Sequence, residues 1–238
     1  MNGINIFQSA WDRSRQSVSL VIVGTCTIFF LAVAGLDLLH VVDRRSAICF
    51  FGLSYEGVFH RYWVHQFLTA PLLHASVTHL LFNMLSLWML GPDIEKILGR
   101  RSYILFTILC AESSMIGSLI FSAGSGSITV GYSGVIFGIL VAQAMYYPDN
   151  VVAIFAFFPL RMKYAALLLA GVELYLSLSP EGGGVAHSAH VVGALTAFLY
   201  LRWQRRRDIY IATKSVRRQE IPSAKIQNWK RYKIPDKL

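Results

Sequence analysis

Charged residues are scarce in this sequence of 238 residues, and their scarcity excludes an ordinary soluble protein. Asp, Glu, Lys and Arg make up only 15% of the chain, whereas apolar residues make up 55%. Charge is absent altogether from residues 16–36, 62–92, 113–148 and 182–201. An uncharged apolar run of about 20 residues can cross the hydrocarbon core of a membrane as a helix. The composition therefore predicts an integral membrane protein rather than a soluble enzyme.

Cysteine is scarce as well, and no two of the three cysteines form a C-x-x-C pair: Cys26, Cys49 and Cys110. This spacing supports neither a disulfide framework nor a cysteine zinc site. Histidine-based metal chemistry fits poorly, because neither His74 and His79 nor His187 and His190 enclose the Glu of an H-E-x-x-H motif. We therefore expect no metal and no cofactor.

Turn signals divide the apolar sequence into six helices. Gly and Pro mark the cuts, at residues 91–92, 123–127, 147–148, 159 and 182–184. The first span lacks a small-residue cleavage site, so we interpret it as retained rather than as a signal peptide. We expect an all-α membrane protein with a short N-terminal segment (1–16), a six-transmembrane-helix bundle (17–203) and a basic tail (204–238). The expected spans are residues 17–39, 72–91, 101–122, 132–148, 162–179 and 186–203.

Basic residues indicate the orientation, because Lys and Arg in short loops are retained on the cytoplasmic side. With the N-terminus inside, six spans place 19 Lys and Arg residues in the cytoplasm and three outside. The three outer residues lie in the long aromatic-rich loop of residues 40–71, namely Arg44, Arg45 and Arg61. We therefore expect both termini to be cytoplasmic.

The segment from Arg202 to Leu238 holds 12 basic and three acidic residues, so its charge of +9 equals that of the whole chain. A polybasic segment directly after a membrane helix is typical of contact with anionic lipid, at about 1 kcal/mol per Lys or Arg. We therefore expect membrane lipid, and not nucleic acid, as the partner of the tail.

A serine flanked by glycines stands at the start of the fourth expected span, in Gly131-Tyr132-Ser133-Gly134. Such a turn can expose the hydroxyl beside the unsatisfied N-terminus of a helix, which suits a nucleophile. Taken alone, the pattern favours an ordinary helix N-cap. The following residue is Val135, so the G-x-S-x-G elbow of soluble hydrolases does not match.

His190 is the candidate partner of Ser133. The fourth and sixth spans both run from outside to inside, and both residues fall within about two turns of the outer ends. An imidazole that accepts the hydroxyl proton makes serine a useful nucleophile. Gly193 and Ala197 form a small-residue face that lets two helices approach closely. For an isolated His190, a hydrogen bond between packed helices is the alternative.

The second span contributes His74, His79 and Asn83. The last two are four residues apart and share a helix face near the outer end. An imidazole and a carboxamide there could donate hydrogen bonds to a developing oxyanion. The alternative is inter-helix hydrogen bonding, which contributes about 0.6 kcal/mol per contact.

From about Phe67 to Ala197 the sequence resembles the rhomboid family of intramembrane serine proteases. The resemblance rests on a set of separately spaced motifs: His74, His79-x-x-x-Asn83-Met84, Glu95-x-x-x-Gly99-Arg100, Gly131-x-Ser133-Gly134 and Ala189-His190-x-x-Gly193.

The resemblance implies that Ser133 is the nucleophile and His190 its general base, as a dyad without an aspartate. It implies an oxyanion hole made by His79, Asn83 and the Ser133 backbone N–H, with His74 more structural. Gly131, Gly134, Phe137 and Gly193 would support this site. Substrates would be single-span or polytopic membrane proteins, cut near the outer face at a small residue in a weakened helix.

Three positions depart from the family pattern. His65-Gln66 stands where the family often has Trp-Arg, which leaves the anchoring of the first outer loop open. Phe137 stands where well-known members place a Tyr against the catalytic histidine, so stacking is kept and the hydroxyl is lost. The sixth span reads Gly193-x-x-x-Ala197 instead of Gly-x-x-x-Gly, and both positions remain small.

Two other classes of function remain open. One is a rhomboid-like protein without catalysis that binds or escorts membrane proteins. The other is a proton-coupled transporter that uses Glu112 and Glu173, since carboxylates inside a membrane are costly and often functional. We expect a bacterial inner membrane protein, because the sequence lacks organelle-targeting features, with a eukaryotic organelle as the alternative.

Overall fold

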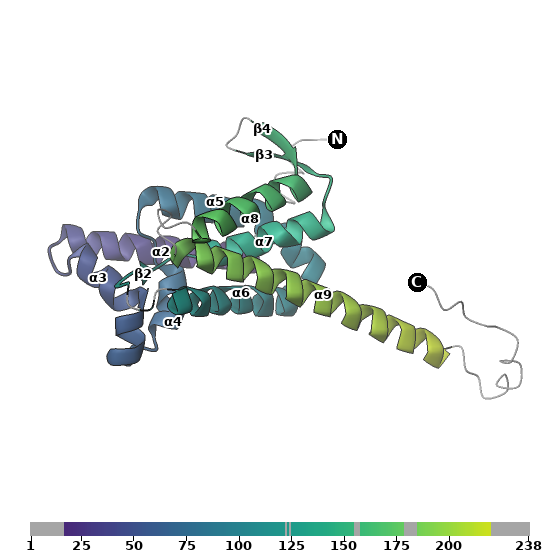
Figure 1. Cartoon of the computed structure of the whole chain (residues 1–238), viewed down its shortest axis with the longest axis horizontal. Coiled ribbons are helices and arrows are strands. Elements are labelled where there is room, and N and C mark those ends of the chain that lie inside the picture. Colours follow the sequence, from purple (N-terminus) through teal and green to yellow (C-terminus); the bar gives the residue numbers. More distant parts are fainter. Residues whose placement is uncertain (1–16, 122, 124, 155–157, 179–184, 220–238) are drawn as a thin grey trace, which may run out of the picture. The chain divides into compact units, whose positions relative to one another are not determined.

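The computed structural model describes residues 17–121, 123, 125–154, 158–178 and 185–219, and these are mostly helical (Figure 1). The expected N-terminal segment 1–16 and the last part of the expected tail 204–238, residues 220–238, lie outside the described residues. The main helices are α2 (Val18–Leu38), α5 (Val77–Leu98), α6 (Arg100–Phe121), α7 (Ser133–Tyr146), α8 (Met162–Leu178) and α9 (Val185–Gln219). The shorter elements are α3 (Arg44–Phe51), β1 (Leu53–Ser54), η1 (Glu56–His60), α4 (Gln66–Thr69), η2 (Ala70–Leu72), β2 (Ile128–Thr129), β3 (Val151–Ile154) and β4 (Phe158–Arg161).

A helix stands at each of the six expected positions, but not every one has the length and composition of a membrane span. Among the described residues, α2 and α6 are long and apolar enough to cross a membrane. A third candidate is the pair formed by Gln66–Leu72 and Val77–Leu98, which is bent by 89°. The count of six spans therefore stays a prediction.

The boundaries of two helices differ from the expected ones. The sequence placed a cut at Gly91-Pro92, yet α5 continues through Pro92 and ends at Gly99, whose positive φ of 74° suits a residue without a side chain. Proline lacks an N–H and is tolerated here in a helix that packs along α2 and α7. The last helix, α9, runs to Gln219 instead of ending near residue 203.

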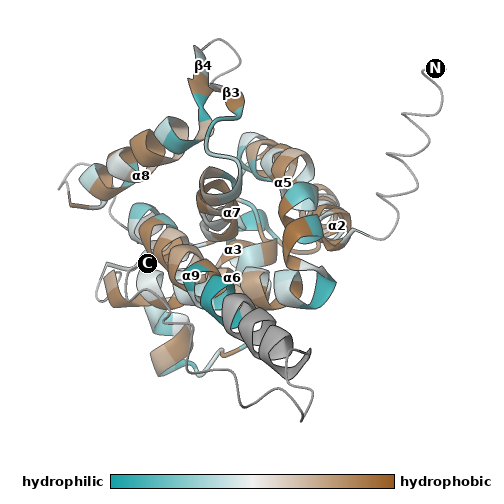
Figure 2. Cartoon of the chain, turned by 90° about the vertical axis from the view of Figure 1, so that its right-hand side faces the viewer, coloured by the Kyte–Doolittle hydropathy of each residue, from teal (hydrophilic) through white to brown (hydrophobic). Residues whose placement is uncertain are grey.

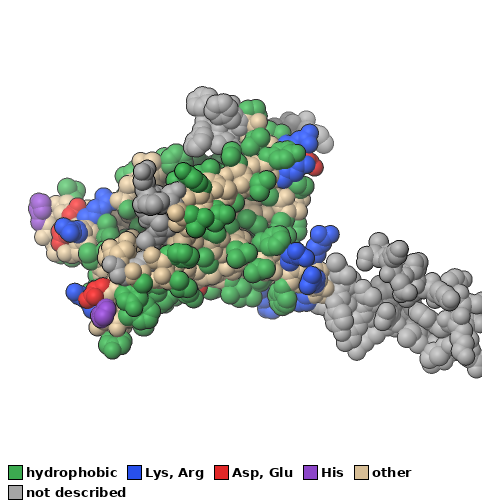
Figure 3. All heavy atoms as spheres, in the orientation of Figure 1, with side chains coloured by type: hydrophobic (Ala, Val, Ile, Leu, Met, Phe, Trp, Pro, Cys, Tyr) green, Lys and Arg blue, Asp and Glu red, His purple; other side chains and the backbone are tan. Residues whose placement is uncertain are grey.

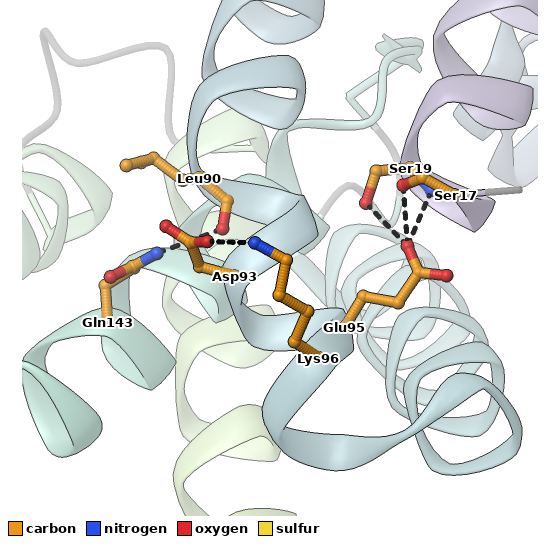
Figure 4. Close-up of polar contacts among 7 residues, drawn as sticks. All are labelled: Ser17, Ser19, Leu90, Asp93, Glu95, Lys96 and Gln143. Atoms are coloured by element: carbon orange, nitrogen blue, oxygen red, sulfur yellow. Dashed lines mark hydrogen bonds and ion pairs between the residues drawn. The ribbon is translucent and has the colours of Figure 1, made fainter. Parts of the chain in front are cut away.

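The start of α2 is held by a side chain from the end of α5. The carboxylate of Glu95 accepts hydrogen bonds from the Ser17 hydroxyl (2.7 Å), the Val18 N–H (2.9 Å) and the Ser19 N–H (3.3 Å), as Figure 4 shows in part. The first N–H groups of a helix have no partner within it, and a negative charge there is favourable. Glu95, which the sequence analysis quoted only as part of a family motif, therefore caps the N-terminus of another helix.

A second long-range contact in Figure 4 joins α7 to α5. The Gln143 amide donates to the carbonyl of Leu90 at 3.0 Å, within one turn of Pro92. Gln143 is buried, so this bond satisfies a polar group that would be costly to leave unpaired between helices.

The segment between α2 and α5 is a folded subdomain rather than a simple loop. β1 pairs antiparallel with β2, with Leu53 opposite Thr129, which joins this segment to the turn before α7. Phe50 and Phe51 pack edge to face, and Trp63 and His65 pack against Phe50. These rings form an aromatic cluster, in keeping with the aromatic-rich composition of residues 40–71.

The side chain of Gln66 anchors this segment. It is fully buried, and its Oε1 accepts from the Ser54 N–H at 3.1 Å. Its Nε2 donates to the carbonyls of Cys49 and Phe50, each at 3.2 Å. One amide therefore ties three backbone groups of the segment together.

We expect Gln66→Leu to lower the free energy of unfolding by about 2 kcal/mol or more, because each buried polar group left unpaired costs about 1–3 kcal/mol. Thermal or denaturant unfolding of the detergent-solubilised protein measures the change. His65→Ala is the neighbouring control: it loses the ring contacts of His65 and one hydrogen bond to the Phe50 carbonyl, which Gln66 still pairs, so its effect should be smaller. Equal stability of the Gln66→Leu protein and the wild type would contradict the anchoring role.

A β-hairpin of β3 and β4 lies between α7 and α8, and the sequence analysis did not expect it. Val151 pairs with Arg161 and Val152 with Leu160. Asp149 beside the hairpin contacts Arg161 and Lys163, and the hydrogen bond from Lys163 holds the pKa of the Asp149 carboxyl below its usual value.

α7 lies among the other helices and is the shortest of the six at 14 residues. It contacts α5, α6 and α8, and Figure 2 shows it between α5 and α8. Small residues permit this packing, since a Cβ on Gly138 would lie 2.9 Å from the Cys110 sulfur of α6 and 3.2 Å from the Ala197 Cβ of α9. The residues of α7 are therefore positioned by several helices at once.

The outer faces of the helices are apolar, and polar side chains lie inside. Figure 3 shows apolar side chains over much of the visible face of the helical part. Ile28 of α2 and Ile120 of α6 are 70% and 68% exposed, whereas Thr107, Ser114 and Ser118 of α6 are buried. Apolar side chains on the outer faces are compatible with lipid as the solvent.

The chain divides into two compact units, residues 1–198 and 199–238. The first unit contains all elements up to and including the first part of α9. In the second unit, the guanidinium of Arg207 lies over the Trp203 ring, 5.2 Å from its centroid.

Candidate active site

Ser133 is the first residue of α7, and the turn before it depends on Gly131. Gly131 has a φ of 110°, which residues with a side chain rarely adopt, and its N–H donates to the Ala70 carbonyl at 2.9 Å. The N-cap of α7 is Tyr132, so the alternative in which Ser133 caps the helix is wrong. The Ser133 N–H belongs to the first turn, where backbone donors have no acceptor within the helix.

The helix that carries the histidine comes very close to the helix that carries the serine. A Cβ on Gly193 would lie 2.4 Å from the Gly134 carbonyl oxygen, closer than real contacts allow. Gly193 and Gly134 therefore let the backbones of α9 and α7 touch, as the small-residue face in the sequence led us to expect.

This close approach brings Ser133 and His190 into hydrogen-bond contact. The distance between His190 Nε2 and Ser133 Oγ is 2.7 Å, although the two residues are 57 positions apart in the chain. The Phe137 ring stacks on the His190 ring, with the ring centroids 4.6 Å apart and the planes 16° from parallel. A hydroxyl is thus paired with an imidazole whose plane is held by an aromatic neighbour.

The other nitrogen of His190 contacts an acidic residue that the sequence analysis did not connect to this site. Glu173 of α8 lies with its Oε2 2.9 Å from His190 Nδ1 and 2.6 Å from His187 Nδ1. The sequence offered two signals, namely a carboxylate within a span and two histidines one helical turn apart. It could not say which helix faces would meet.

These three residues also form a group of potential metal ligands, in which Glu173 comes from a different helix than His187 and His190. The donor atoms of Glu173, His187 and His190 all lie within 4.8 Å of one another. In the structure, hydrogen bonds link the same atoms.

The expected oxyanion residues lie at the start of α5. A Cβ on Gly131 would lie 2.6 Å from His79 Cε1, so the His79 ring packs directly on the glycine two positions before Ser133. Asn83 is buried, and its Nδ2 donates to the His79 carbonyl at 2.9 Å. That bond uses one of the two amide hydrogens of Asn83.

His74 is not on the second long helix, as the sequence analysis expected, because α5 begins at Val77. It lies in the bend between η2 and α5, where Ser76 caps α5 by accepting from the His79 N–H. His74 is buried, with its Nδ1 3.2 Å from the Leu72 carbonyl and its ring edge to face with that of His79. Its position suits support of His79.

Comparison with known proteins assigns the family. Residues 61–207, more than half of the chain, match the model of the rhomboid domain. The chain therefore belongs to the rhomboid family, and together with its apolar helices this makes it an integral membrane protein.

Similar proteins include plant, bacterial and human ones. The chain is 24% identical to Rhomboid-like protein 15 of Arabidopsis thaliana over 211 residues, which is 83% of this chain and 49% of that protein. It is 26% identical to Rhomboid protease GlpG of Pectobacterium atrosepticum over 184 residues, 75% of this chain and 62% of that protein. It is 34% identical to RHOMBOID-like protein 1 of Arabidopsis thaliana over 155 residues, 63% of this chain and 38% of that protein. The chain thus spans less than two thirds of the length of each.

Proposed function

We propose that this protein is an intramembrane serine endopeptidase that cleaves transmembrane proteins near the outer face of the membrane through Ser133 and His190. The observation that carries the proposal is the 2.7 Å contact between His190 Nε2 and Ser133 Oγ. The match to the rhomboid domain and the likeness to proteins named rhomboid proteases support it.

The proposed reaction uses the two residues in turn. His190 takes the Ser133 proton as the oxygen attacks the scissile carbonyl carbon, which gives a tetrahedral intermediate with a negatively charged oxygen. The imidazolium then donates its proton to the leaving amine, and an acyl-enzyme remains. Water attacks the ester with His190 as base, which releases the new carboxyl end and restores the Ser133 hydroxyl.

Stabilisation of the oxyanion falls to donors around the start of α7. The Ser133 N–H, the free amide hydrogen of Asn83 and the His79 imidazole are the proposed set. The packing of His79 on Gly131 and the hydrogen bond from the Gly131 N–H to the Ala70 carbonyl support the inclusion of His79 in this set. Donors held in place before the reaction stabilise developing charge without further reorganisation.

Cleavage of a single-span reporter by the purified protein tests the proposal. The reporter carries a small residue next to a Gly- or Pro-weakened segment at the outer end of its span, and mass spectrometry locates the new ends. Two product fragments are expected. Stable binding of an uncut reporter would instead favour the escort function, and proton flux without cleavage would favour a transporter.

The proposed topology has six spans, both termini in the cytoplasm and the basic tail against anionic lipid on that side. We expect single cysteines introduced at residue 3 or 235 of a variant without native cysteines to resist a membrane-impermeant maleimide in intact bacterial cells until the membrane is opened. This expectation follows from the 19-to-3 distribution of basic residues. A cysteine at exposed Tyr62, in the aromatic-rich segment, is the control that should react at once. Immediate labelling at residue 235 would overturn the orientation.

A further inference from the structure

Glu173 holds a position that the proposed two-residue mechanism does not use. Its side chain is 15% exposed, and its Oε2 faces both His190 and His187. A carboxylate in a membrane-spanning helix is costly, so its partners are informative. One of them is the proposed general base.

We propose that Glu173 is a positioning residue for His190, so that Ser133, His190 and Glu173 form a triad with His187 holding the same carboxylate oxygen. This inference rests on the proposed function, because it assigns Glu173 a role in the proton transfer between Ser133 and His190. It differs from the dyad that the family resemblance implies.

Glu173 sets the tautomer of His190. A neutral imidazole carries one N–H, and the lone pair of the other nitrogen must face the Ser133 hydroxyl if the ring is to act as a base. A carboxylate accepts hydrogen bonds and does not donate, so Glu173 at 2.9 Å keeps the proton on Nδ1. The lone pair of Nε2 then points at Ser133 Oγ, 2.7 Å away.

Glu173 also balances the positive charge that forms on His190. When Ser133 gives up its proton, His190 becomes an imidazolium in a poorly hydrated place. The carboxylate of Glu173 is in direct contact with that cation and stabilises it, which is the role of the acidic member in soluble serine proteases. No group has to move for this to happen.

His187 keeps Glu173 in place. His187 Nδ1 donates to the same Oε2 at 2.6 Å, so the carboxylate accepts two N–H bonds even though its helix is apolar. His187 and His190 are one turn apart on α9, and both contact Glu173 of α8. A carboxylate held from two sides cannot swing away from His190.

The test compares Glu173→Gln, Glu173→Asp and a matched control, Glu112→Gln, which makes the same chemical change at a half-buried carboxylate on α6. We expect Glu173→Gln to lower kcat by roughly 10²- to 10⁴-fold with little change in KM, as for the acidic member of a triad. The kcat of Glu173→Asp should be at least about tenfold higher than that of Glu173→Gln and lower than that of the wild type, because aspartate keeps the negative charge on a shorter side chain. Glu112→Gln should match the wild type.

Labelling of Ser133 by a serine-directed fluorophosphonate gives a second readout that a purely structural glutamate would not change. Its rate should fall in parallel with kcat in folded Glu173→Gln protein. Wild-type kcat and labelling in Glu173→Gln would overturn the triad and leave the dyad intact, whereas a wild type that neither cleaves nor labels would overturn the proposed function itself. If the Glu173→Gln protein does not show the wild-type unfolding transition, the Glu173→Asp protein is used for the test instead. Wild-type rates of cleavage and labelling in Glu173→Asp would then reject the positioning role.

Discussion

Replacing Ser133 or His190 by alanine is expected to abolish cleavage, with a loss in kcat of about 10⁶-fold, as when either member of a nucleophilic unit is removed. Ser133→Ala removes the attacking oxygen, and His190→Ala removes the acceptor of its proton, which lies 2.7 Å away. The double variant should be scarcely worse than either single one, because the two residues act in one step. Initial rates with the single-span reporter measure all three variants.

The thermal stability of the Ser133→Ala protein distinguishes a catalytic serine from a serine that caps the helix. Ser133 is the first helical residue and Tyr132 is the N-cap, so Ser133→Ala should leave the melting temperature almost unchanged. A capping serine would cost about 1 kcal/mol on the same substitution.

Chemical labelling tests whether His190 activates the Ser133 hydroxyl. A fluorophosphonate should modify wild-type Ser133 and spare the His190→Ala protein, because an unactivated hydroxyl is a poor nucleophile. Full cleavage by purified Ser133→Ala protein would falsify the assignment of Ser133 as the nucleophile.

Loss of the oxyanion donors is expected to give the second largest effect. Asn83→Ala and His79→Ala should each lower kcat about a hundredfold and change KM much less, because their hydrogen bonds strengthen as negative charge develops. His79 lies against Gly131, just before the start of α7, and the buried Asn83 is one turn further along α5. Steady-state kinetics on the reporter separate kcat from KM.

Thr78→Ala is the matched control for these two variants, because Thr78 is exposed and precedes His79 on the same helix. It should keep the wild-type kcat. If both Asn83→Ala and His79→Ala keep the wild-type kcat with an unchanged melting temperature, the two side chains are structural, and the Ser133 N–H and other donors must stabilise the oxyanion.

Most helices could be located from the sequence because their physical cause is local. An apolar run with at most two charged residues gave 17–39 for α2, 101–122 for α6 and 162–179 for α8, each within about two residues of the observed helix. Where the signal was a single Pro, as at Pro92, the prediction of a helix end was wrong, since packing against neighbouring helices can hold a helix together across a proline.

The sequence by itself indicated the solvent and the family, and it named the candidate reactive pair. The lack of charge requires lipid as solvent, and the spacing of the motifs names Ser133, His190, His79 and Asn83 without any coordinates. Only the tertiary structure decided which side chains meet. Gln66 ties the outer segment, Glu95 caps a helix whose first residues are more than 70 positions away, and Glu173 joins His190 from a separate helix. The reason is that helix periodicity fixes which residues share a face of one helix, whereas the rotation and depth of neighbouring helices depend on the contact between Gly134 and Gly193 and on the packing of the whole bundle.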